Sequence, residues 1–178
     1  MVATYETKTD YKVIGNSPIR HDGLDKVTGR AIYGGDVKAP GLIWGDLLRS
    51  PHAHARIKSI DTSAAEAMEG VFAVLTHADF PQADDKTIDA GEGTVNLRRG
   101  QANVMADNKV HYKGHVVAAV AAVDRNTAQV AAQAIKVEYE VLTPVSDVDS
   151  AMADGAPIIL DGLVGDHLGE NVDNTNVA

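Results

Sequence analysis

Apolar and polar residues follow their most regular patterns in the second half of the chain. Residues 116–123 form an unbroken apolar run, which is typical of a strand covered on both faces. Residues 109–112 are expected to lead into this run, and residues 137–142 alternate strictly, which predicts a half-buried strand. The side chains of this last strand that point inward are expected to be Val137, Tyr139 and Val141.

The segment between the two long strands has the signals of a helix. Asn126 is placed to cap its first turn, Gln129 completes a capping box, and the helix is expected to run to about Lys136. A strand–helix–strand order requires a right-handed crossover if the two strands are parallel. The apolar stripe that faces the core is expected to be Ala128, Ala131 or Ala132, and Ile135.

Shorter apolar pieces, separated by turns, fill the rest of the chain. Ser63 with Glu66 predicts a capped helix that ends at Gly70, where a left-handed backbone stops it. Ser146 is expected to cap a further short helix that ends at Gly155. The strands predicted in the first half are 31–33, 42–49, 55–60 and 71–75.

Four stretches show little periodicity. Residues 1–13 are a polar lead, and residues 14–41 are rich in Gly and turn residues, which indicates an extended arm. Residues 81–104 are expected to form a long loop, and loops of that length are usually functional or part of an interface. The predicted organisation is one domain over 14–160, which includes the arm, followed by a connector over 161–178.

Composition excludes several classes of function. The 178 residues carry a net charge of −9, and Arg98-Arg99 is an isolated basic pair, which argues against a nucleic-acid partner. Without cysteine, the chain holds no disulfide, thiolate metal site or cysteine-ligated iron–sulfur cluster. It begins without the apolar region of a secretory signal and has no run long enough to span a membrane. A cytoplasmic location is expected, and export of a folded complex on a partner's signal stays open.

Two pairs of histidines are the strongest candidates for chemistry. On a strand, His52 and His54 would point the same way, which suits metal ligation, but the neighbouring sequence offers no third ligand. His111 and His115 flank a turn into the apolar run, where histidines are usually surface or hydrogen-bonded groups. Structural or interface roles are therefore expected, and a small metalloenzyme built on His52 and His54 is the least favoured alternative.

The remaining polar motifs match no catalytic or ligand-binding pattern. Gly34-Gly35 and Gly91-Glu92-Gly93 belong to neither a dinucleotide-binding nor a phosphate-binding motif. The residues of other candidate motifs also lack the required context of a calcium loop or a nucleophile elbow: Asp84-Asp85, the carboxylates of 147–154, Ser17, Ser50 and Ser63. Residue chemistry alone predicts a mixed α/β domain to which no catalytic, cofactor-binding or metal-ligating residue is assigned.

Five blocks of sequence follow one another in a fixed order and resemble a known family. They are similar to its motifs KVTGxAxYxxD, LRSPHAHARI, IDTSxAxxxxGV, xDKVRYxGxxVAAVAA and VEYExLPxV. The family is that of the molybdenum hydroxylase large subunits, which includes xanthine dehydrogenase and aldehyde oxidase. Val116 departs from the pattern, because a proline is common there, and this affects subfamily placement more than membership. The blocks are residues 27–36, 48–57, 60–71, 107–122 and 137–145.

The resemblance implies the family's α/β hammerhead fold, a mixed sheet with a few packed helices. It also implies a larger enzyme that inserts a water-derived oxygen at an activated C–H of an aldehyde or N-heterocycle. A related branch instead removes a phenolic hydroxyl from an aromatic acyl-CoA. In the family, molybdenum held by molybdopterin (the cytosine dinucleotide form included) performs the chemistry, and [2Fe–2S] clusters pass electrons on, commonly to FAD.

The catalytic base and the pterin-cradling loops of the family lie downstream of its hammerhead domain, so the resemblance transfers no site residue to this chain. The expected role is structural: packing against molybdenum-binding domains or a molybdenum-binding subunit, and seating a small [2Fe–2S] subunit, with an FAD subunit in some members. The arm 14–41 and the segment 81–104 are the expected contacts. A split-gene subunit and a fragment both fit the sequence, and the alternative is a free-standing interaction domain without a redox role.

Overall fold

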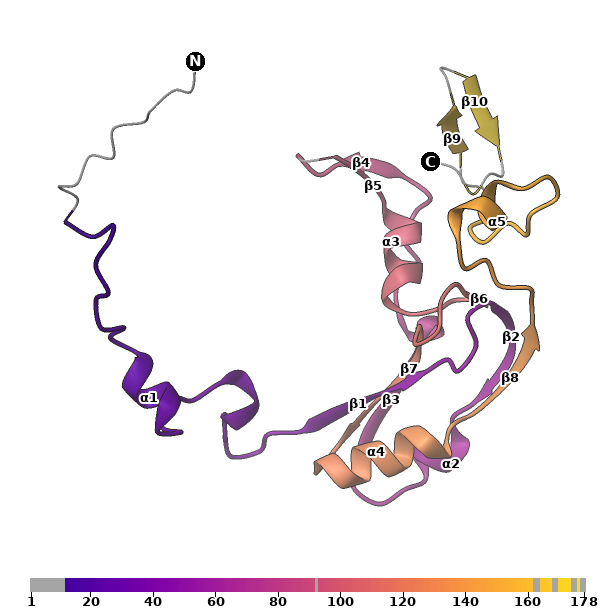
Figure 1. Ribbon diagram of the computed structural model, residues 1–178. Helices are drawn as coiled ribbons and strands as arrows, with labels where there is room; N and C mark the ends of the chain where they lie inside the picture. The colour runs from indigo at the N-terminus through magenta and orange to yellow at the C-terminus, as the bar shows by residue number, and fades with distance from the viewer. Residues whose placement is uncertain (1–11, 92, 162–163, 168–169, 174–175, 177–178) are drawn as a thin grey trace, which may run out of the picture. The chain divides into compact units, whose positions relative to one another are not determined.

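The computed structural model describes residues 12–91, 93–161, 164–167, 170–173 and 176, and its strands build two small three-stranded sheets (Figure 1). The chain divides into two compact units, Met1–Gly41 and Leu42–Ala178. Both core clusters of the described residues belong to the second unit. No described helix has the length and apolar character needed to cross a membrane.

The first sheet has the strand order β1-β7-β3, and both pairings are antiparallel. Its central strand β7 (Val116–Ala122) is the predicted apolar run, which confirms a buried strand there. Its neighbours are β1 (Trp44–Arg49) and β3 (Val71–Thr76), close to the bounds that the sequence predicts. Ala119 of β7 lies opposite both Leu47 of β1 and Leu75 of β3.

Helix α4 (Arg125–Ala134) packs on one face of this sheet (Figure 1). Its predicted stripe is confirmed, because Ala131, Ala132 and Ile135 form a buried cluster with Ala118 and Val120 of β7. The predicted cap is wrong. Asp124, whose backbone is extended, accepts the Thr127 N–H at 2.8 Å and starts the helix two residues before Asn126.

The second sheet has the order β6-β2-β8 and is also antiparallel. It consists of β6 (Lys109–Val110), β2 (Ala55–Asp61) and β8 (Lys136–Val141). Strands β7 and β8 therefore lie in different sheets, and no crossover between parallel strands is formed by the described strands. Val137 and Tyr139 are partly buried as expected, but Val141 is 62% exposed, because it is the last residue of its strand.

Two further predicted helix starts are shifted by one residue. Helix α2 (Ser63–Glu66) begins after Thr62, whose hydroxyl donates to the Glu66 carboxylate at 2.6 Å, whereas the Ser63 hydroxyl donates to Asp61. Helix α5 (Val148–Met152) begins after Asp147, which accepts the Ser150 N–H at 2.8 Å in place of Ser146. Gly70 and Gly155 have the left-handed backbone that the sequence predicts, with φ values of 85° and 75°. The helices themselves end earlier, at Glu66 and Met152, so the predicted stops are three to four residues too late.

The segment predicted as a long loop has secondary structure of its own. It contains the hairpin β4 (Thr87–Asp89) and β5 (Thr94–Asn96), followed by helix α3 (Leu97–Val104). Asn96 caps α3 by accepting the Arg99 N–H at 3.0 Å. After β3 comes the 3-10 turn η2 (His77–Asp79), and in the predicted connector β9 (Val164–His167) pairs with β10 (Glu170–Asp173).

The first unit contains helix α1 (Gly23–Val27) and the 3-10 turn η1 (Gly34–Asp36). The strand predicted over 31–33 is wrong, because these residues pair with no other described segment. Instead the Tyr33 N–H donates to the Asp36 carboxylate at 3.0 Å and closes η1. Exposed ion pairs, such as Asp22 with Lys26 at 2.7 Å, support the helix.

Candidate functional site

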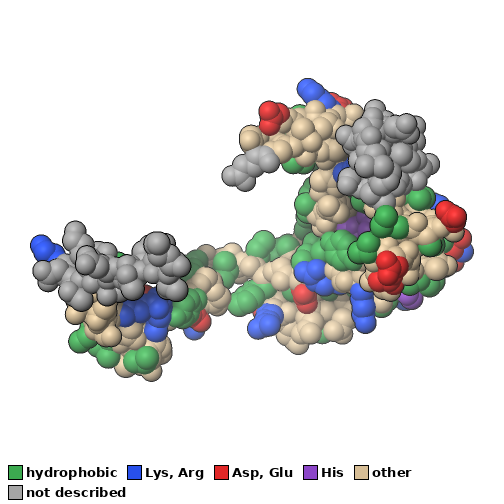
Figure 2. All heavy atoms as spheres, turned by 45° about the horizontal axis from the view of Figure 1, so that its top comes forward, with side chains coloured by type: hydrophobic (Ala, Val, Ile, Leu, Met, Phe, Trp, Pro, Cys, Tyr) green, Lys and Arg blue, Asp and Glu red, His purple; other side chains and the backbone are tan. Residues whose placement is uncertain are grey.

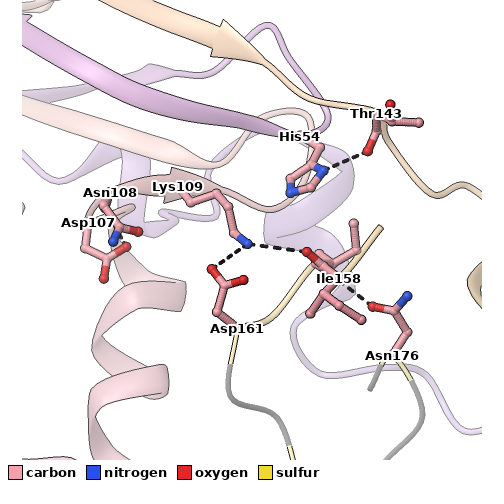
Figure 3. Close-up of polar contacts among 9 residues, drawn as sticks. His54, Asp107, Asn108, Lys109, Thr143, Ile158, Asp161 and Asn176 are labelled. Carbon is pink, nitrogen blue, oxygen red and sulfur yellow. Dashed lines mark hydrogen bonds and ion pairs between the residues drawn. The ribbon is translucent and has the colours of Figure 1, made fainter. Parts of the chain in front are cut away.

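The first histidine pair does not form a common site. His52 and His54 lie in the bend before β2, so the strand geometry that would align them is absent. The His52 ring meets the edge of Tyr139, with ring centroids 5.0 Å apart. The buried His54 donates from Nδ1 to the Thr143 carbonyl at 2.7 Å, which ties the start of β2 to the end of β8 (Figure 3). The two rings thus serve separate structural contacts.

The second pair is brought together and holds the turn between β6 and β7. His115 is fully buried, its ring stacks on Tyr112, and its Nε2 lies 2.9 Å from the Ala102 carbonyl at the end of α3. Its Nδ1 accepts the His111 backbone N–H at 3.3 Å. One ring nitrogen therefore donates and the other accepts, which is the pattern of a neutral imidazole. Of the two roles expected for this pair, surface or hydrogen-bonded, His115 has the hydrogen-bonded one.

Both rings of this pair are held in the neutral form. Burial, then the proximity of His115 and Lys109, lowers the pKa of His111 from 6.5 to about 4. Burial also lowers the pKa of His115. Neither ring is tuned to exchange protons near pH 7, as a general acid or base would be.

A buried lysine, which no sequence motif marks, anchors the segment after α5. The Lys109 side chain is 3% exposed, and its ammonium group lies 2.7 Å from the Asp161 carboxylate and 3.4 Å from the Ile158 carbonyl (Figure 3). The hydrogen bond from Lys109 lowers the pKa of Asp161. The sequence around it, Asp107-Asn108-Lys109-Val110, does not mark this lysine as buried. In the fold, Asp161 supplies the counter-ion that a buried ammonium requires.

Asn176 makes a second attachment of the same segment. Its carbonyl oxygen accepts the Ile159 N–H at 3.1 Å, and its amide group donates to the carbonyls of Ala151 and Pro157 at 3.2 and 3.0 Å. The two attachments fix residues 157–161 against α5 and β6 (Figure 3). They have the character of a structural latch, because the buried ammonium of Lys109 and the amide of Asn176 both bind protein groups of this segment.

A pocket of about 370 Å³ lies beside this latch. Its walls mix basic and acidic groups and so favour no single charge on a ligand. A group of three or more His, Asp or Glu residues able to hold a metal is absent from the described part of the chain. We assign no molybdenum or cluster ligand to these residues. The charged side chains that line the pocket are Asp85, Arg98, Arg99, Asp107 and Asp161, and the neutral His111 ring joins them.

The arm differs from the rest of the chain in its burial. None of residues 12–41 is buried, and only Asp22, Gly23 and Ala31 are partly covered. Many large apolar side chains exposed along one segment are typical of an interaction site. The large apolar side chains exposed on the arm are Val13, Ile14, Ile19, Leu24, Val27, Ile32, Tyr33 and Val37.

Comparisons with known sequences identify the family of this chain. The family described as "Aldehyde oxidase and xanthine dehydrogenase, a/b hammerhead domain" matches residues 28–143. The carbon monoxide dehydrogenase large chain of Afipia carboxidovorans is 43% identical over 135 residues, which are 76% of this chain and 16% of that protein. The nicotinate dehydrogenase large molybdopterin subunit of Eubacterium barkeri is 33% identical over 150 residues, which are 84% of this chain and 33% of that protein.

Solved structures show the same fold. The carbon-monoxide-reduced Cu,Mo-CO dehydrogenase matches 88% of this chain with a TM-score of 0.70 and 39% identity, over 20% of its own chain. Quinoline 2-oxidoreductase from Pseudomonas putida 86 matches 87% with a TM-score of 0.69 and 34% identity, again over 20% of its chain. The chain thus corresponds to a small part of each of these larger proteins.

Proposed function

The chain belongs to the aldehyde oxidase and xanthine dehydrogenase family, as its a/b hammerhead domain, and we propose that it is a structural part of a molybdenum-containing oxidoreductase. In this role it packs against a molybdenum-binding polypeptide and helps to seat a small [2Fe–2S] polypeptide, with an FAD polypeptide in members that use one. It supplies no catalytic residue of its own. The organisation proposed is a hammerhead domain over 14–160 and a connector over 161–178.

The chemistry is proposed to reside in the partners. They would hold the molybdopterin, in its cytosine dinucleotide form or another, and the iron–sulfur clusters, in a complex assembled in the cytoplasm. The names of the relatives include carbon monoxide, nicotinate and quinoline as substrates, although all of them share this domain. Substrate choice is therefore assigned to the partner, with aldehydes, N-heterocycles and aromatic acyl-CoA thioesters as the classes to test.

One observation carries the structural role: the arm places eight large apolar side chains on the surface without burying a residue among 12–41. Leaving such side chains in water forgoes about 25 cal/mol per Å² of apolar surface, which association with a partner would recover. The hydrogen bonds of α1 and η1 meanwhile give the arm a defined local shape. An ordered segment with apolar side chains exposed is suited to docking.

The proposal is tested by purifying the tagged full chain from its native host and measuring molybdenum and iron in the same sample. We expect a molybdenum-bearing and an iron–sulfur polypeptide in stoichiometric amounts. Exchanging Leu24 and Val27 of the arm together for serine should reduce their recovery several-fold. Lys38→Ser, an exposed change on the same arm, is the matched control and should leave recovery unchanged.

A metal-free chain purified alone would contradict the proposal. It would favour the alternative, a free-standing interaction domain that has the hammerhead fold and no redox role. If the double serine variant recovered the partner polypeptides as well as the wild type does, the arm would not be part of the interface. The proposed complex itself would not be contradicted.

A further inference from the structure

One face of the β1-β7-β3 sheet is covered by α4, and the opposite face is open beyond Val117, which is buried against Ala55, Ala106 and Val110. In an antiparallel sheet, residues directly opposite each other point to the same side, so register shows which side chains share a face. Ala118 and Val120 of β7 point toward α4, where they join the buried cluster. The intervening residues Ala119 and Ala121 point the other way and are only partly covered.

Two complete rows of side chains cross this opposite face. One row is Leu47, Ala119 and Leu75, and the other is Gly45, Ala121 and Ala73. Leu47 is 42% exposed and Leu75 is 41% exposed. We call these six residues the open face. No residue of either row is charged or polar, and Figure 2 shows hydrophobic side chains gathered over the strands of this sheet.

The sequence of β7 indicates that the open face, like the face against α4, is buried in the assembled protein. Strands that read Val-Val-Ala-Ala-Val-Ala-Ala occur where both faces of a sheet are buried, because water on one face selects polar residues at alternate positions. Helix α4 supplies the first cover. Among the described residues of the second unit, no helix packs over Ala119 and Ala121 as a second cover.

The other sheet shows how this chain treats a face that stays in water. The outward side of β2 and β8 carries Arg56 opposite Glu140 and Ser59 opposite Glu138, and all four are exposed. Opposite charges paired across strands are compatible with water. The two rows of the open face carry no such groups. This indicates that the open face is buried in the assembled protein.

We infer that the open face is the surface on which the molybdenum-binding polypeptide of the proposed function docks. This inference rests on that proposed function. Among the relatives, the domain makes up only 16% of the carbon monoxide dehydrogenase large chain, so the cover of this face can come from the remaining polypeptide of the same protein. The small residues in the centre admit close approach, so the partner presents an uncharged apolar surface, whose side chains fit between Leu47 and Leu75.

The test introduces charge on the open face of the full chain in its native host. Leu47→Lys with Leu75→Lys should lower the molybdenum and partner polypeptide recovered per chain at least tenfold. Ser59→Lys is the matched control, because it adds charge at an exposed strand position beside Glu138, and it should keep recovery at the wild-type level. Circular dichroism and thermal melting of each purified variant separate a lost contact from a lost fold.

If the double variant misfolds, a second measurement tests the inference. Amide hydrogen exchange of β1 and β3 is compared between the free wild-type chain and the chain in the complex. Slower exchange of both strands in the complex supports the inference, and unchanged exchange overturns it.

Full recovery of the partner polypeptide with a folded double variant overturns the inference but does not contradict the proposed function. A wild-type chain purified without molybdenum contradicts the proposed function itself. If the wild-type chain forms a homodimer that dissociates in the double variant, the open face is instead the contact between two copies of this chain.

Discussion

At the scale of single residues, the pair of Lys109 and Asp161 is unequal in its surroundings. The lysine side chain is 3% exposed and the aspartate side chain is 65% exposed. Removing the partner of a buried charge costs more than removing the partner of a hydrated one. The two halves of the pair should therefore respond differently to neutralisation.

We expect Asp161→Asn to lower the free energy of unfolding by about 1–3 kcal/mol, because it leaves a buried ammonium with a weaker partner. Lys109→Met should cost less than half as much, since it fills the same space without a charge and leaves Asp161 hydrated. Urea denaturation of the full chain measures both. A larger loss for Lys109→Met would mean that Lys109 stabilises the fold through contacts other than this pair.

The neutral histidines predict how stability depends on pH. The pKa of His111 falls from 6.5 to about 4 in the folded chain, and the pKa of His115 is lowered in the same direction. As the pH drops below 6.5, the unfolded chain takes up protons first, so the free energy of unfolding decreases. The slope is up to about 1.4 kcal/mol per pH unit for each histidine.

The pH window separates this effect from that of the carboxylates. Asp61, Asp79 and Asp161 have a pKa lowered from 3.8, so their contribution is lost only as the pH falls below that value. Denaturation between about pH 7 and 4.5 therefore reports on the histidines. His111→Leu should flatten the slope, whereas His21→Leu, at an exposed position, should not. An unchanged slope in His111→Leu would refute the assignment.

Residue identities in the site were only partly predictable from sequence. The sequence identified His115 as a surface or hydrogen-bonded group, but the helix caps at Asp124, Thr62 and Asp147 were each misplaced by one or two positions. Ser, Thr, Asn and Asp all cap helices, so a stretch with several of them leaves the starting residue undecided. The link from Lys109 to Asp161 joins residues far apart in sequence, and no local pattern predicts it.

At the scale of elements, the turn from α2 into β3 is closely packed against the start of α4. A Cβ at Gly70 would stand 2.8 Å from Val123 Cγ1 and 3.5 Å from Thr127 Cγ2, and the Gly70 carbonyl accepts the Val123 N–H at 2.8 Å. Gly155 also has a positive φ, but a Cβ there would meet nothing within 4 Å.

Alanine at these two glycines should separate backbone strain from crowding. Gly155→Ala should cost about 1 kcal/mol, the penalty for a left-handed residue with a side chain. Gly70→Ala should cost about 2–4 kcal/mol, because the overlap with Val123 adds to that penalty. Thermal melting of the two variants gives the comparison. Equal losses would mean that α4 moves away at little cost.

Elements with strong periodicity were predicted best. Strand β7 and the inner stripe of α4 follow the pattern of their apolar residues, because burial and sequence agree there. The segment 81–104 was predicted as a loop, although it contains β4, β5 and α3. Strands of three residues are too short to show a period, and the polar composition of α3 hides its helical spacing.

At the scale of the whole molecule, the family resemblance supplied the fold that periodicity alone could not. Apolar patterns predicted most of the strands but not their division into two sheets, and the crossover suggested for β7 and β8 was not formed. Pairing between β1 and β7 joins segments some seventy residues apart, so their register depends on tertiary packing. The openness of one face of that sheet could be recognised only once α4 was placed on the other.

The location of the core outside the arm predicts how little the arm contributes to the free energy of unfolding. Every residue of the two buried clusters lies between Ala55 and Ile135, and no residue of 12–41 is buried. Deleting Met1–Gly41 should therefore change the melting temperature of the remaining chain by less than about 2 °C, which corresponds to roughly 0.5 kcal/mol. Val120→Ala, a buried truncation, is the positive control and should cost about 2 kcal/mol. The same deletion should lower recovery of the molybdenum-bearing polypeptide at least as much as the double serine exchange, because it removes the whole apolar arm while the open face stays in place. A large loss of stability would instead make the arm part of the fold itself.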